Sequence, residues 1–158
     1  MRKIFAVMIA LWAFCGQAYA IELPDSFGEW RKLSGNILPL ITEYNGESHG
    51  RVVYVTYRRE SPSGTLDVIL TEGTGAGNLY VPEKVNTAKG MMPSDSGYEV
   101  VKVSGHDAII ESQSYMPVVL SVKVGENITL NLESPSAGKE ELMRIAEEIL
   151  SWRVTESD

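Results

Sequence analysis

Two runs near the end of the chain, residues 118–124 and 128–133, alternate apolar and polar side chains at every second position. This period of two is the pattern of a β-strand that buries one of its faces. In the second run we expect Thr129, Asn131 and Glu133 to point away from the buried face. The three residues between the runs are few enough for a turn. The pair therefore predicts a hairpin within an antiparallel sheet that has one buried and one wet face.

The C-terminal region has a different period. Apolar residues recur there at helical spacing, at Leu142, Ile145, Ala146, Ile149 and Trp152. The preceding Ser134-Pro-Ser136 ends a strand and supplies an N-cap, and acidic residues follow in the first turn, where the helix dipole favours them. A helix is predicted here, with its apolar stripe packed on the buried face of the sheet.

Four further runs are rich in β-branched and aromatic residues and are predicted as strands: residues 51–58, 65–71, 98–103 and 106–112. Residues 21–50 are interrupted by Pro and Gly and receive no strand assignment. A short helix is expected over residues 78–89. The predicted fold class is α+β: an antiparallel β-sheet of about five to six strands covered on one face by a C-terminal α-helix, a two-layer sandwich.

The first twenty residues have a separate character. Arg2 and Lys3 precede an apolar run over residues 4–14, and residues 17–20 provide a small-x-small cleavage pattern. The alternative is a membrane anchor, but the run is about half of the roughly 20 residues that a spanning helix needs. We therefore expect a cleaved signal peptide over 1–20, a single domain over 21–158 with no transmembrane segment, and a periplasmic or secreted location.

Charge limits the partners of this chain. It has 14 Lys+Arg and 21 Asp+Glu, a net charge of −7, and cleavage after residue 20 leaves 12 basic and 21 acidic residues, or −9. An acidic surface opposes binding to nucleic acid, whose phosphates require basic residues, and to anionic lipid. Nucleic acid is therefore not an expected partner.

The chain has one cysteine, Cys15, and it lies in the predicted signal peptide. Modification of Cys15 as a lipoprotein is disfavoured because the bulky Phe14 precedes it. The mature chain would then contain no thiol, which excludes disulfides, thiol redox chemistry, Cys-ligated zinc and a Cys nucleophile.

Glycines at 73, 75 and 77 follow a predicted strand, where a phosphate-binding loop would lie. The segment lacks the Gly-Lys-Ser/Thr end of a P-loop, and Asn78 breaks the G-x-G-x-x-G spacing. A connecting loop is the better interpretation.

The chain has two histidines, His49 and His106, each next to or near a carboxylate. Neither has nearby in sequence the three or four ligands that zinc requires, so no metal and no cofactor are predicted. Asp107 would point to the opposite strand face from His106 and could not easily orient its imidazole. Surface turn positions are the favoured interpretation. The alternative is a small hydrolase or metal-dependent enzyme that uses His106 with carboxylates gathered by folding.

A last group of residues suggests a contact surface, because Met and Tyr are frequent where a protein accepts an apolar or peptide partner. Ordinary core and rim packing is the competing interpretation. The sequence favours a non-catalytic exported domain that binds an envelope protein or a small apolar ligand, and it makes no prediction of oligomeric state. The candidate binding residues are Tyr80, Met91, Met92, Tyr98, Tyr115 and Met116.

Overall fold

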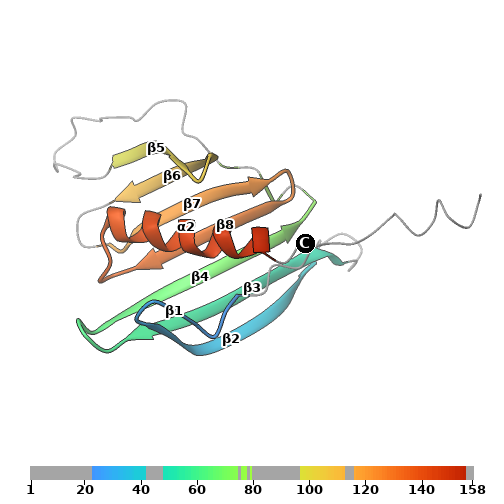
Figure 1. The fold of residues 1–158 in the computed structure, drawn as a ribbon. Helices are drawn as coiled ribbons and strands as arrows, with labels where there is room; N and C mark the ends of the chain where they lie inside the picture. The colour runs from blue at the N-terminus through green and yellow to red at the C-terminus, as the bar shows by residue number, and fades with distance from the viewer. Residues whose placement is uncertain are drawn as a thin grey trace, which may run out of the picture.

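The computed structural model describes residues 23–41, 48–74, 76–77, 79, 97–112 and 116–155, with the backbone alone at 41, 48 and 153–155. These residues form eight strands and one helix (Figure 1). The elements are β1 (Ser26–Phe27), β2 (Trp30–Ile41), β3 (Ser48–Arg59), β4 (Gly64–Gly73), β5 (Gly97–Val103), β6 (His106–Ser112), β7 (Val118–Gly125), β8 (Ile128–Ser134) and α2 (Lys139–Thr155).

All eight strands belong to one sheet in the order β1-β2-β3-β4-β8-β7-β6-β5, and every neighbouring pair is antiparallel. The first four strands form one meander and the last four form another. The two meanders join where β4 pairs with β8. This arrangement leaves β1 and β2 at one side of the sheet and β5 at the other (Figure 1).

The expected strand count of five to six was wrong, because the sheet has eight strands. The two additional strands, β1 and β2, lie in the stretch that received no assignment. Gly35 and Pro39 interrupt the strand pattern of β2, yet its backbone pairs with β3 from Arg31 to Ile41. Backbone pairing rather than alternating burial therefore holds this strand in place.

The helix α2 packs on one face of the sheet, as predicted, and contacts β7, β8 and β5. We call this the inner face and the opposite one the outer face. Leu120 lies opposite Leu132 and Val122 lies opposite Leu130, so the final hairpin buries the alternating residues expected from the sequence. Side chains from both layers form the fully or nearly fully buried core, including Val55, Tyr57, Leu66, Val68, Leu120, Val122, Leu130, Leu132, Leu142, Ile145 and Ile149.

A serine stabilises the turn that connects β8 to α2. The Ser134 hydroxyl accepts hydrogen bonds from the backbone N–H groups of Ser136 at 3.1 Å and Ala137 at 3.0 Å, and it donates to the Thr65 carbonyl at 2.7 Å. The Ser134-Pro-Ser136 segment thus ends β8 as expected, but the N–H groups that Ser134 binds precede Lys139, so Ser134 stabilises the turn before α2 and does not cap the helix. Within the described residues, no helix has both the length and the apolar character required to cross a membrane.

Candidate interaction surface

The second strand, β2, lies near one side of the sheet and is paired unequally on its two edges. One edge pairs with β3 along the strand. On the other edge, the described pairs are with β1, at Trp30 and Arg31. Among the described residues, no strand pairs with the rest of that edge, over residues 33–40, which lies at one side of the sheet (Figure 1).

Three large apolar side chains of this outward segment are exposed. Leu33 is 60% exposed, Ile37 61% and Leu38 51%. We call these three residues the edge band. Three exposed large apolar side chains within six residues of one strand are more than the scattered single residues of an ordinary surface, and this favours a contact site.

The edge band occupies both faces of the sheet. Ile37 lies opposite Val53, a core residue, and therefore belongs to the inner face. Leu38 lies opposite Val52 and belongs to the outer face. Leu33 lies at the register shift between Lys32 and Ser34. A binding partner that contacts all three side chains must therefore extend around the edge of the sheet.

The segment is also electrically neutral. Residues 33–40 include no Asp, Glu, Lys or Arg, although the whole chain carries a net charge of −7. A partner that contacts residues 33–40 desolvates no charge of their own, although the Lys32 side chain lies beside Gly35. The surface is suited to an apolar contact rather than to an ionic one.

The residues predicted from the sequence to form a contact surface fall into two groups. Tyr80, Met91, Met92 and Tyr115 lie outside the described residues. Tyr98 is exposed on β5, where its hydroxyl donates a hydrogen bond to the Glu111 carboxylate at 3.1 Å. Met116 is exposed in the segment that leads into β7. Because β6 lies between β5 and β7, Tyr98 and Met116 do not meet on adjacent strands.

His106 lies at the first position of β6, directly after a two-residue turn. Ser104 and Gly105 both have positive φ, at 49° and 84°, as a tight two-residue hairpin turn requires. The neighbouring Asp107 pairs with Lys102 rather than with the imidazole. In the described part of the chain, no three His, Cys, Asp or Glu side chains are placed to hold a metal ion. An enzyme based on His106 stays a hypothesis of the sequence.

Three N–H groups of the glycine-rich loop after β4 donate hydrogen bonds within the protein. Gly73 donates to the Asn127 carbonyl at 2.9 Å, Thr74 to His49 at 3.2 Å and Ala76 to Gly73 at 3.0 Å. Thr129 lies on the outer face as expected, yet it is buried, and its hydroxyl donates to the Ala76 carbonyl of this loop. These N–H groups connect the loop to the sheet and do not form a cradle for phosphate.

The edge band was not predicted from the sequence. The available signal was the uncharged segment 33–40 with four large apolar residues, but Gly35 and Pro39 concealed its strand character. Side chains exposed on both faces of one strand also lack the alternation by which strands are recognised.

Comparison with known proteins provides no relative for this chain: no family model, no curated protein and no solved structure matches it.

Proposed function

We propose that this chain is an exported, non-catalytic binding module that recognises another protein of the cell envelope through the edge band. The observation that carries the proposal is the exposure of Leu33, Ile37 and Leu38 along one open strand. The charged n-region, apolar run and small-x-small site of residues 1–20 support export.

A protein partner is favoured over a small apolar ligand by the distribution of these side chains. A small molecule is normally held in a concave site that covers most of its surface. The edge band instead places Ile37 and Leu38 on opposite faces of one strand. A protein surface is large enough to contact both faces and to bury the three side chains together.

The chemistry of the partner surface follows from the edge band and its surroundings. The apolar side chains require an apolar contact, with few charged groups at its centre. A strongly acidic partner would be repelled by the net negative charge of this chain. The surface we propose is therefore an uncharged apolar patch on an envelope protein.

Site-specific photo-crosslinking in the envelope of the source cell tests this proposal. A photo-reactive amino acid at Leu38 should give one discrete crosslinked product, whereas the same group at Glu147, an exposed residue of α2, should not. Adding Ile37→Ser to the Leu38 crosslinker should reduce the product at least about fivefold, as for the loss of a central interface side chain.

Ile37→Ser must leave the melting temperature unchanged for this test, and we expect it to, since the side chain is mostly exposed. Equal products from positions 38 and 147, or a product that is insensitive to Ile37→Ser, would refute the edge band as the contact surface.

A further inference from the structure

The direction of the backbone groups of β2 follows from a hydrogen bond two strands away. The Gly73 N–H donates to Asn127 of the β7–β8 turn, so Gly73 faces β8. Backbone groups alternate sides along an antiparallel strand, so Leu70, three residues earlier, faces β3. Val53 lies opposite Leu70, so its backbone N–H and C=O groups face β4. Ile37 lies opposite Val53 on the other side of β3, so the backbone groups of Ile37 face away from β3. The backbone groups of Gly35, Ile37 and Pro39 therefore lie along the outward edge.

The outward edge offers few hydrogen-bond donors. The Ile37 N–H already donates to the Oδ1 atom of Asn36 at 2.9 Å. Pro39 has no N–H, and proline is found in sheets where the missing donor would face out of the ladder. Gly35 is the remaining outward position. Its N–H is removed neither by a proline ring, as at Pro39, nor by the side-chain hydrogen bond that occupies Ile37.

Register shifts bound this segment at both ends. One lies between Lys32 and Ser34, and the other between Leu40 and Ile41. Bulges of this kind, together with proline, are the features by which natural proteins protect an edge strand from pairing with another chain. The backbone of β2 is protected in this way, whereas the side chains of the edge band are exposed.

We infer that the β2 edge is closed to strand addition by Asn36 and Pro39, and that its partner is a folded protein whose apolar groove receives the edge band. The part concerning the partner rests on the proposed function. An extended peptide would need backbone donors in register, and two of the three outward positions do not provide them. A groove on a folded partner fits the exposure of the edge band on both faces of the sheet, because the two walls of the groove contact Ile37 on the inner face and Leu38 on the outer face.

The inference predicts that opening the edge will create strand pairing between copies of the chain. In the purified variant Asn36→Val/Pro39→Val, the N–H of Ile37 loses its side-chain acceptor and residue 39 gains an N–H, so both positions offer an outward donor. We expect it to self-associate at least about tenfold more tightly than the wild type in sedimentation velocity, because added backbone hydrogen bonds increase affinity. Amide hydrogen exchange at residues 35, 37 and 39 should slow in the associated form.

Ser34→Val is the matched control, because it adds the same side chain at an exposed position whose backbone faces β3. It should sediment as the wild type does. If the double variant does not fold, Asn36→Val provides the test, and exchange of the Ile37 amide should accelerate in its monomer.

Three results would overturn the inference: equal self-association of the double variant and Ser34→Val, wild-type pairing with slowed exchange at Gly35 and Ile37, or unchanged exchange at Ile37 in Asn36→Val. Failure of the proposed function is distinguishable, because it concerns crosslinking from position 38 and leaves these measurements on the purified chain unaffected.

Discussion

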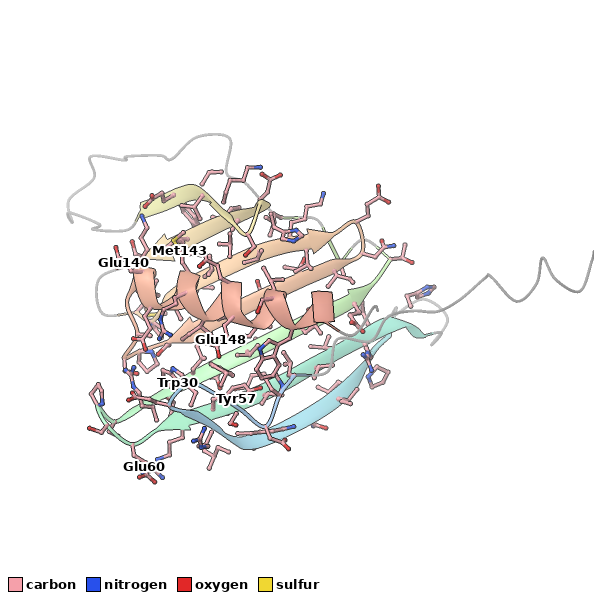
Figure 2. All side chains as sticks on the ribbon, in the orientation of Figure 1. Trp30, Tyr57, Glu60, Glu140, Met143 and Glu148 are labelled. Carbon is pink, nitrogen blue, oxygen red and sulfur yellow. The ribbon has the colours of Figure 1, made fainter. Side chains whose placement is uncertain are left out.

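The guanidinium carbon of Arg59 lies 4.6 Å from the centre of the Trp30 ring. The same side chain pairs with the Glu141 carboxylate of α2 and donates from Nε to the Pro62 carbonyl at 2.9 Å. Arg59 is buried, and a buried charge requires partners that replace water. One side chain at the end of β3 thus connects the start of β2, the β3–β4 turn and the first turn of the helix. Trp30 and Tyr57 lie at the side of the sheet formed by β1–β3 (Figure 2).

Replacing Arg59 with methionine should destabilise the fold. The change leaves the partly buried Glu141 carboxylate without its counter-charge and removes the cation from the Trp30 ring. We expect a loss of about 2–3 kcal/mol in the free energy of unfolding. Urea denaturation followed by tryptophan fluorescence measures it. Arg58→Met, at an exposed neighbouring position, should change the free energy by less than about 0.5 kcal/mol, and equal losses in the two variants would contradict the assigned role.

Tyr57 should make stability depend on pH in the alkaline range. Burial, and secondarily the charge of Asp25, raises the pKa of the Tyr57 phenol well above its ordinary value of 10.0. The phenol is neutral in both states below pH 10, and above it the unfolded chain ionises first. The free energy of unfolding should therefore fall as pH rises above 10.

Tyr57→Phe should make this fall shallower in urea titrations at pH 8 to 11. At pH 8 the variant should lose about 1 kcal/mol, because the Tyr57 hydroxyl no longer donates to the Pro24 carbonyl at 2.7 Å. Parallel slopes for the two proteins above pH 10 would show that Tyr57 does not cause the pH dependence.

Gly50 should not tolerate a side chain. A Cβ at this position of β3 would overlap the backbone carbonyl oxygen of Glu72 on β4. Gly50→Ala must separate the two strands locally, at a cost of about 2 kcal/mol or more. At Gly125 no described atom beyond its two chain neighbours lies within 4 Å of the added Cβ, so Gly125→Ala should stay within about 0.5 kcal/mol of the wild type. Thermal unfolding compares the pair, and a similar decrease in both would contradict the steric argument.

The part of the fold that the sequence predicts is the part in which burial follows chain periodicity. The final hairpin alternates because its inner residues pack under α2, and the helix repeats its apolar positions for the same reason. Two of the eight strands were predicted from this alternation, and four more from their β-branched and aromatic residues. Nothing in a local window specifies that β4 pairs with β8, since that contact joins residues more than fifty positions apart.

The edge band illustrates why the candidate site could not be predicted. Residues 31–39 are exposed on both faces of β2, so burial imposes no period on them. Their strand conformation comes from pairing with β3, a long-range relationship of the backbone. Tyr98 and Met116, selected for residue type, are exposed as a contact site requires, but they lie on the other half of the sheet from β2.

Lys102 should control the ionisation of Asp107. The hydrogen bond and the charge of Lys102 are the main causes that lower the pKa of the Asp107 carboxyl, and the charge of Lys123 contributes less. A lowered pKa means that the folded state holds the carboxylate more firmly than the unfolded chain does, so this contribution to stability is present above the unfolded pKa and is lost as pH falls. Carboxyl chemical shifts recorded by NMR from pH 2 to 7 report the pKa directly. Lys102→Gln should raise it more than Lys123→Gln does, and salt should reduce both differences because the groups are exposed. An Asp107 pKa that does not respond to Lys102→Gln would show that Lys102 is not the main cause of the lowered pKa.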